Sequence, residues 1–238
     1  MNNTFENYKL KIEPEIFETY PDYSALIIYA KNLVNAPSND YSTEVLREAE
    51  KTARANFAGI ELGNHPHISR WREAFHSFKA KPKKYFCGAE ALLRRVVIGE
   101  SIPTINQIVD VYNAVSIKYA IPAGGEDWSR ITSDLKLIRS KGTEPFATLT
   151  SNGEQLDFPS IGEVIWADNS GATVRRWNWR QCFRTRITAE TTHAYFVLDG
   201  LSPVNVDILK QAGQELIDHL KHLSPGASIS TEILDETN

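Results

Sequence analysis

A run of arginines interleaved with tryptophans is the most unusual chemical feature of this sequence. Residues 175–186 contain five arginines, two tryptophans and no acidic residue: Arg175, Arg176, Trp177, Trp179, Arg180, Arg184 and Arg186. Guanidinium groups attract phosphates and an unpaired base stacks on an indole ring, so this composition favours RNA binding. The same side chains also form buried cation–π clusters and polar networks that brace a sheet. The residues alone leave both interpretations open.

A second basic stretch, residues 70–95, carries eight lysines and arginines against two acidic residues. Within it we expect five side chains to contact phosphates: Lys81, Lys83, Lys84, Arg94 and Arg95. The whole chain of 238 residues has a net charge of −4, which argues against a protein that binds nucleic acid over its entire surface. The sequence therefore predicts local basic patches rather than a uniformly basic protein.

Two carboxylates stand where a ligand could reach them. Asp199 follows the apolar run 195–198 and precedes a glycine, so we expect it at a strand end, facing a pocket. Glu126 belongs to the segment 124–127, Gly-Gly-Glu-Asp, which we predict to be a tight turn whose glycines let a ligand approach the backbone. Ordinary turn or cap residues are the alternative interpretation at both positions.

Metal and nucleophile chemistry has weaker support in the sequence. His65, His67 and His76 supply imidazoles, but no neighbouring cysteine or paired carboxylate completes a ligand shell, so no metal site is predicted. Cys182 lies between two arginines that would lower the pKa of its thiol, and a buried structural cysteine is the alternative. The usual motifs of nucleotide-binding loops, serine hydrolases and zinc proteases do not occur.

The N-terminus, the apolar runs and the cysteines bear on the cellular compartment. The first eight residues are polar, and no apolar run approaches the ~20 residues of a membrane span, so we expect neither a signal peptide nor a transmembrane helix. The two cysteines, Cys87 and Cys182, stand in unrelated contexts and are expected to be free thiols. These features predict a cytoplasmic protein.

Hydrophobic periodicity predicts helices in the first half and at the C-terminus, with mostly strands between them. Helices are expected at 42–58, with Ser42 as the cap, and at 69–78, 87–98, 103–119 and 202–223. Strands are expected at 25–34, 135–138, 146–149, 163–167, 172–177 and 193–198. The polar residues 224–238 are predicted to be a flexible tail. Because helices and strands segregate in part, we predict one α+β domain over residues 1–238.

Four blocks in this order, residues 105–113, 122–127, 175–186 and 187–200, resemble the editing domain (B3/B4) of the phenylalanyl-tRNA synthetase beta subunit, in its free-standing form. The resemblance covers residues 70–201. It implies a mixed β-sheet core flanked by helices, and an aminoacyl-tRNA deacylase that hydrolyses an amino acid wrongly esterified to tRNA, with no metal or other cofactor. The implied partner is the aminoacylated 3′ end of tRNA, not DNA or a membrane, and we expect a monomer or a weak homo-oligomer.

The same resemblance assigns positions in the pocket. The synthetase domain's pocket glutamate corresponds to Asp199, and its pocket aspartate corresponds to Asp127. Its pocket histidine has no equivalent, because Gly124 stands at about that position. The bulky segment 176–181 replaces a wall of small residues, so we expect a pocket of different shape.

An aminoacyl ester is already activated, so its hydrolysis requires a positioned water and donors to the oxyanion rather than a covalent nucleophile. We expect Asp199 to bind the amino group or a polar side chain of the substrate, and Gly124 and Gly125 to shape the wall. Donors to the ester, ribose or terminal phosphate are expected among Arg176, Asn178 and Arg180. Activation of the water stays open between Asp199, Glu126 and the neighbouring ribose hydroxyl. The alternatives to an enzyme are a non-catalytic tRNA or amino-acid binding module of the same fold and a protein-interaction scaffold.

Overall fold

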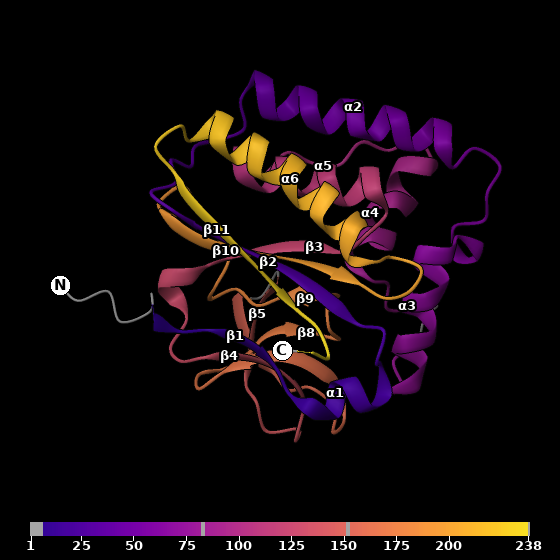
Figure 1. The fold of residues 1–238 in the computed structure, drawn as a ribbon, viewed down its shortest axis with the longest axis vertical. Helices are drawn as coiled ribbons and strands as arrows, with labels where there is room; N and C mark the ends of the chain where they lie inside the picture. Colours follow the sequence, from indigo (N-terminus) through magenta and orange to yellow (C-terminus); the bar gives the residue numbers. More distant parts are fainter. Residues whose placement is uncertain (1–6, 82–83, 151–152, 238) are drawn as a thin grey trace.

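Two β-sheets lie one above the other in the computed structural model, and a layer of helices covers the outer face of one of them (Figure 1). The structure describes residues 7–81, 84–150 and 153–237. The predicted α+β class is confirmed by this arrangement. Among the helices of the described residues, none combines the length and the apolar character that spanning a bilayer requires.

The helix-covered sheet is antiparallel, and its strand order is β11 (Ser228–Leu234), β2 (Ser24–Lys31), β10 (His193–Gly200) and β3 (Ala123–Asp127). Side chains alternate between its two faces because successive residues of a strand point in opposite directions. On β2, Leu26 and Ile28 pack toward the helices, whereas Ile27 and Tyr29 pack toward the second sheet. Both faces are therefore buried, which explains why residues 25–30 carry no charged side chain; the strand predicted at 25–34 ends at Lys31, before Asn32 with its positive φ of 56°.

Three helices form the covering layer: α2 (Asp40–Asn56), α5 (Gln107–Tyr119) and α6 (Val206–Leu223). Each begins at an asparagine whose side chain accepts a hydrogen bond from a backbone N–H of the first turn: Asn39, Asn106 and Asn205. These caps satisfy donors that a helix start leaves unpaired. Ser42, predicted as the cap of α2, lies three residues inside it and completes a capping box with Asn39.

The second sheet has the strand order β1 (Leu10–Ile12), β4 (Leu135–Arg139), β7 (Val164–Asp168), β8 (Gly171–Arg175) and β9 (Arg180–Gln181). A hairpin lies beside it, formed by β5 (Phe146–Thr150) and β6 (Gly153–Asp157). The remaining helical segments are α1 (Pro14–Thr19), α3 (Pro66–Ser77), α4 (Gly88–Val97) and the short 3-10 turns Leu62–Asn64 and Trp128–Arg130. α3 runs along one side of the two sheets, and α4 lies beside α5 in the helical layer (Figure 1).

Trp177 anchors the core between the sheets. It is fully buried, and its ring lies within about 5 Å, centroid to centroid, of three other rings: Tyr20 at 4.8 Å, Tyr23 at 4.7 Å and Trp71 at 5.2 Å, all edge to face. Arg176 and Trp177 both have positive φ, 47° and 65°. The strand predicted at 172–177 therefore ends at Arg175, because this left-handed turn reverses the chain and leads it into β9.

Two predictions about local structure are wrong. Residues 124–127 form most of strand β3 instead of a tight turn, because their backbones pair with β10 on one side and with the 185–186 segment on the other. Residues 228–234, placed in a flexible tail, form β11 and pair with β2 along its length. In both cases a long-range backbone ladder forms the strand: it overrides the glycines of 124–127, and in 228–234 it pairs a segment that already contains the β-branched residues Ile229, Thr231 and Ile233.

Candidate functional site

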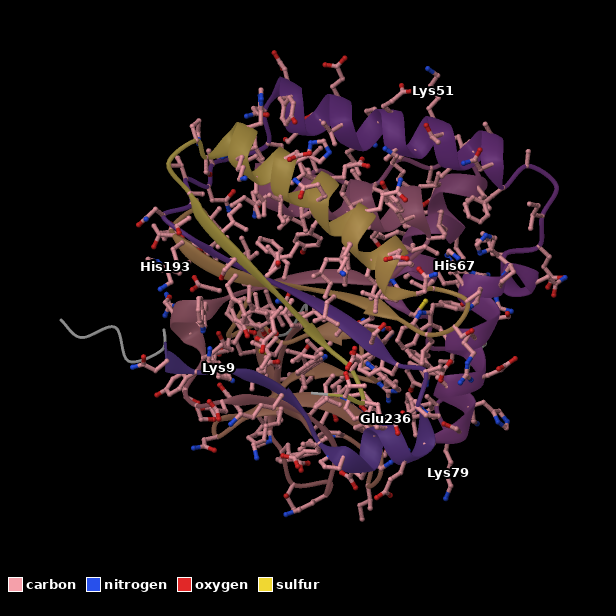
Figure 2. All side chains as sticks on the ribbon, in the orientation of Figure 1. Lys9, Lys51, His67, Lys79, His193 and Glu236 are labelled. Carbon is pink, nitrogen blue, oxygen red and sulfur yellow. The ribbon has the colours of Figure 1, made fainter. Side chains whose placement is uncertain are left out.

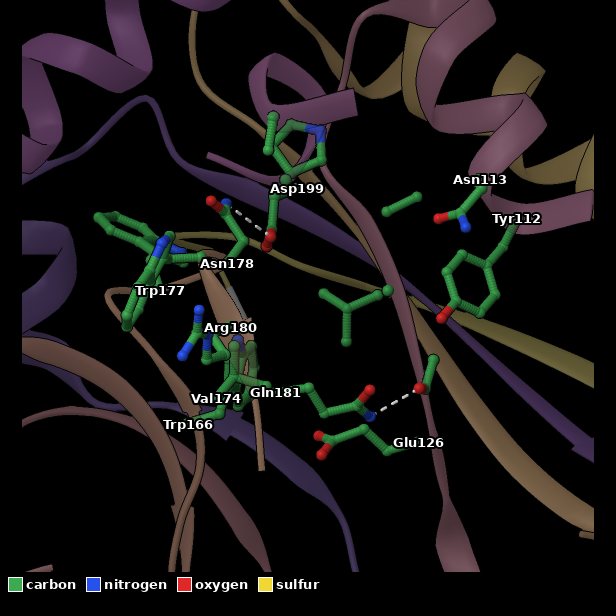
Figure 3. Close-up of a pocket in the computed structure, with 18 of the residues that line it drawn as sticks. Tyr112, Asn113, Glu126, Trp166, Val174, Trp177, Asn178, Arg180, Gln181 and Asp199 are labelled. Atoms are coloured by element: carbon green, nitrogen blue, oxygen red, sulfur yellow. Dashed lines mark hydrogen bonds between the residues drawn. The ribbon is translucent and has the colours of Figure 1, made fainter. Parts of the chain in front are cut away.

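A cavity of about 280 Å³ lies between the two sheets, at the end where β3, β8 and β9 meet α4. Its floor is one face of the helix-covered sheet: Tyr195, Val197 and Asp199 alternate along β10, and Gly124 and Glu126 lie opposite them on β3. The facing walls come from β7, β8, the 177–181 segment and the ends of α4 and α5: Trp166, Val174, Trp177, Asn178, Trp179, Arg180, Gln181, Gly88, Ala91, Leu92, Tyr112 and Asn113. Asp199 and Glu126 stand at opposite ends of this cavity (Figure 3).

Asp199 is buried, with 3% of its surface exposed, and both of its carboxylate oxygens accept hydrogen bonds. The hydroxyl of Tyr23 donates to Oδ1 at 2.6 Å, and Nδ2 of Asn178 donates to Oδ2 at 3.0 Å (Figure 3). Burial disfavours the charged form and raises the pKa of Asp199 to about 6, although the two donors lower it in part. At neutral pH this carboxylate is therefore ionised but only weakly stabilised.

Glu126, also 3% exposed, is held by hydroxyl groups from three separate segments. Thr173 donates to Oε2 at 3.0 Å, Tyr195 donates to the same oxygen, and Thr185 donates to Oε1. Burial raises the pKa of Glu126 above its usual range despite these donors. Burial raises the pKa of Tyr195 well above that of an ordinary phenol, and the charge of Glu126 raises it further.

The two glycines of β3 face in opposite directions. A Cβ built on Gly124 would meet nothing within 4 Å, whereas one on Gly125 would lie 2.5 Å from the Phe196 ring on the helix side of the sheet. Gly124 thus opens the floor of the cavity, in agreement with its predicted role in shaping the wall. Gly125 also lines the cavity, but the lack of a side chain there permits close packing of β3 on the neighbouring layer. Its carbonyl accepts a hydrogen bond from Gln181 at 2.8 Å (Figure 3).

The arginine run divides into members that form ion pairs and ring contacts within the protein and exposed members, for which RNA binding stays a prediction. Arg175 and Arg184 form ion pairs, at 2.8 Å with Glu163 and at 2.7 Å with Asp168. Arg176 is 8% exposed, does not line the cavity, and lies over the rings of Tyr85 at 3.7 Å and Trp179 at 4.3 Å. Asn178 and the exposed Arg180 do line the cavity, and Arg180 stacks on Trp179 at 4.6 Å.

Asp127 is buried but points away from the cavity. Its carboxylate accepts hydrogen bonds from Ser129 and Thr191, and so caps the short turn after β3. Asp127, to which the sequence resemblance assigned the position of a pocket aspartate, thus has structural contacts and does not line this cavity.

The predicted phosphate-binding residues lie on two neighbouring surfaces. Lys81 and Lys84 are exposed in the connection between α3 and α4, and Lys79 at the end of α3 points into solvent (Figure 2). Arg94 and Arg95 are exposed on α4; Arg94 lies over the Phe86 ring at 4.4 Å, and Arg95 pairs with Glu100 at 3.2 Å. Lys83 lies outside the described residues.

The cysteines and histidines take structural places. Cys87 and Cys182 are both buried, and burial raises the pKa of each thiol, that of Cys87 to about 12, which leaves neither activated as a nucleophile. His65 precedes α3, and His67 lies in its first turn. Within residues 7–81, 84–150 and 153–237, no group of three or more His, Cys, Asp and Glu side chains is placed to hold a metal ion.

Several side chains of the site were not predicted from the sequence. The donors to the two carboxylates, Tyr23, Tyr195, Thr173 and Thr185, come from distant segments. The alternation of residues 195, 197 and 199 in a predicted strand was a usable signal, because it places Tyr195 on the same face as Asp199. The partners from other strands carried no such local signal.

The family model of the B3/4 domain matches residues 70–220 of this chain. A solved structure, the N-terminal fragment of the phenylalanyl-tRNA synthetase beta-subunit from Pyrococcus horikoshii, is similar over 94% of this chain, with 11% sequence identity and a TM-score of 0.49. The chain spans about half the length of that structure, since 50% of it is covered. No curated protein matches the sequence.

Proposed function

This chain belongs to the B3/4 domain family, as the sequence resemblance predicted, and from that premise we propose that it is a free-standing editing module that hydrolyses mischarged aminoacyl-tRNA. The substrate is the ester between an amino acid and the terminal ribose of tRNA. The observation that carries the proposal is the cavity between the sheets, whose lining combines a buried carboxylate, Asp199, with the half-buried Trp179 and the exposed Arg180. A volume of about 280 Å³ suits an aminoacyl group rather than a whole nucleotide.

In the proposed reaction, the ionised Asp199 binds the α-ammonium group of the substrate. Arg180 and Trp179, which line the same cavity and contact each other, take the terminal phosphate and base of the tRNA. Water then attacks the acyl carbon, the bond from that carbon to the ribose oxygen breaks, and the proton from water passes to the ribose oxygen. The side-chain amide of Asn178 donates a hydrogen bond to Asp199 and so fixes the orientation of the carboxylate. The neighbouring ribose hydroxyl holds the attacking water.

Purified protein is expected to release amino acid from at least one mischarged tRNA without added metal. The test is a panel of tRNAs mischarged with different amino acids, with ester loss followed over time in the presence of EDTA. Spontaneous hydrolysis of each ester without protein is the control. Inhibition by EDTA would contradict the metal-free mechanism, and failure on the whole panel would contradict the hydrolase.

Binding without hydrolysis on that panel would favour a non-catalytic tRNA or amino-acid binding module. One observation favours this second function: the lining of the cavity, among the residues that the structure describes, includes no histidine. A direct binding measurement on the same mischarged tRNAs separates the two functions.

Binding of tRNA is expected to weaken steeply with salt, because phosphate contacts release counterions on binding. The double variant Lys81→Ala/Lys84→Ala should reduce the slope of log K against log salt by about 2, with no change in amino acid preference. The matched control is Lys51→Ala/Lys210→Ala, which removes two exposed charges from α2 and α6. Equal slopes for the test and control variants would remove the α3–α4 connection from the tRNA contact.

A further inference from the structure

Two buried carboxylates face the same cavity, and neither has a cationic partner. In the part of the chain that the structure describes, no lysine, arginine or histidine forms an ion pair with Asp199 or Glu126; their hydrogen-bond donors are the neutral groups of Tyr23, Asn178 and three hydroxyl residues. Elsewhere in the described interior, some buried carboxylates are paired with a cation, as Glu163 is with Arg175 and Glu50 with Arg47. Asp110 and Asp127 accept hydrogen bonds from neutral donors, but neither lines the cavity. Among the described residues, Asp199 and Glu126 are therefore the buried carboxylates without an ion pair that border the cavity.

Burial without a counter-charge disfavours the ionised form of a carboxyl group, and it raises the pKa of both Asp199 and Glu126; a nearby cation would favour the ionised form again. Here the space beside both carboxylates is empty cavity, not packed protein. The missing positive charge can therefore come from a ligand, and a ligand with cationic groups at both ends would neutralise both carboxylates together.

The spacing of the two carboxylates sets the shape of such a ligand. Glu126 lies opposite Tyr195, which precedes Asp199 by four residues on the same strand and the same face. Four residues of a strand correspond to roughly 13 Å between Cα atoms, and the two side chains lie at opposite ends of the cavity (Figure 3). A single ammonium group cannot contact both, whereas two ammonium groups separated by a chain of several carbons can.

The surface between the two carboxylates fits an aliphatic chain. Val197 on the floor and Val174 and Trp166 on the facing wall are apolar, and Gly124 leaves room beside them. A methylene chain buries favourably against such a surface.

We propose that the cavity binds an elongated diammonium group, and that the amino acid removed by this protein is a diamino acid such as lysine or ornithine. The identity of the ligand as an aminoacyl ester rests on the proposed function. Asp199 binds the α-ammonium beside the ester, and Glu126, at the opposite end of the cavity, binds the side-chain ammonium (Figure 3). Glu126 is then a residue that determines specificity, and a neutral side chain would leave its charge without a partner.

The test is titration calorimetry with L-lysinamide and L-norleucinamide, two amides that share the α-ammonium and differ in the side-chain ammonium. Lysinamide is expected to bind roughly 10- to 150-fold more tightly, since one charge-assisted contact is gained. Equal affinities, or tighter binding of norleucinamide, would overturn the inference. The measurement needs no variant and no tRNA.

Substitutions of the two carboxylates test which of them binds which ammonium group. Glu126→Gln should abolish the preference for lysinamide while norleucinamide binds as before, and Asp199→Asn should weaken both ligands. Glu44→Gln, an exposed carboxylate on α2, is the control and should change neither affinity. A preference for lysinamide that survives Glu126→Gln, in a variant that melts like the wild type, would contradict the role of Glu126. If Glu126→Gln does not fold, the wild-type comparison still decides.

A further set of measurements, with charged tRNAs and with cadaverine, distinguishes an aminoacyl ester from a free diamine as the ligand. If tRNA charged with lysine or ornithine is deacylated faster than tRNA charged with methionine, the inference and the proposed function both hold. If cadaverine binds as tightly as lysinamide and no charged tRNA is hydrolysed, the diammonium site holds and the proposed function fails. If other mischarged tRNAs are hydrolysed but lysinamide shows no preference, the proposed function holds and the inference fails.

Discussion

Asp199→Asn is expected to lower kcat/KM on the best mischarged tRNA by roughly 10- to 150-fold while the protein stays folded. The substitution keeps the size of the side chain and removes the charge that binds the substrate ammonium. Its carbonyl oxygen can still accept from Asn178, and its amide can donate to the Tyr23 hydroxyl, so both neighbours keep a partner. Steady-state deacylation and a thermal melt on one preparation measure the two effects.

The same variant should melt at least as high as the wild type at pH 8. The pKa of Asp199 is about 6 in the folded protein, above the value near 4 of an unfolded aspartate. The free energy of unfolding therefore falls as the pH rises from about 4 to about 6. Above that range the total loss reaches up to about 3 kcal/mol. Asparagine removes this penalty. A lower melting temperature with an unchanged rate would instead identify Asp199 as a structural residue.

Gly124→Val is expected to lower activity by at least about 100-fold with little loss of stability, because displacement of a bound substrate by about 1 Å already costs that much. The Cβ of the valine causes no clash, since no atom lies within 4 Å of its position, and valine is favoured in strands. Its branches would project into the floor of the cavity. The measurements are deacylation rate, lysinamide affinity and the melting temperature.

Two other glycine variants serve as controls for Gly124→Val. Gly125→Ala should destabilise the fold by about 1 to 3 kcal/mol, since its Cβ would meet the Phe196 ring at 2.5 Å. Gly226→Ala, in open space away from the cavity, should change neither stability nor rate beyond small amounts. Full activity in Gly124→Val would show that the substrate does not occupy this cavity.

The sequence alone predicts the elements whose signals are local. The apolar spacing in 42–58 and 103–119 identified α2 and α5. The cap of α2, Asn39, lies before the predicted start, and the cap of α5, Asn106, lies inside the predicted range. Helix period and the alternation of strand residues depend only on near neighbours. For the same reason Asp199 was placed correctly near the end of a strand.

The tertiary structure decided the chemistry of the cavity. Tyr23 and Asp199 are 176 residues apart in sequence, and Glu126 takes its donors from residues 47 to 69 positions away. The pairing of β3 with β10 turned a glycine-rich segment into a strand and aimed Glu126 into the same space as Asp199. Local patterns carry no information on such contacts, because they arise from packing between segments that meet only in the folded chain. The missing counter-charge of the two carboxylates could be recognised only once every neighbour in space was known.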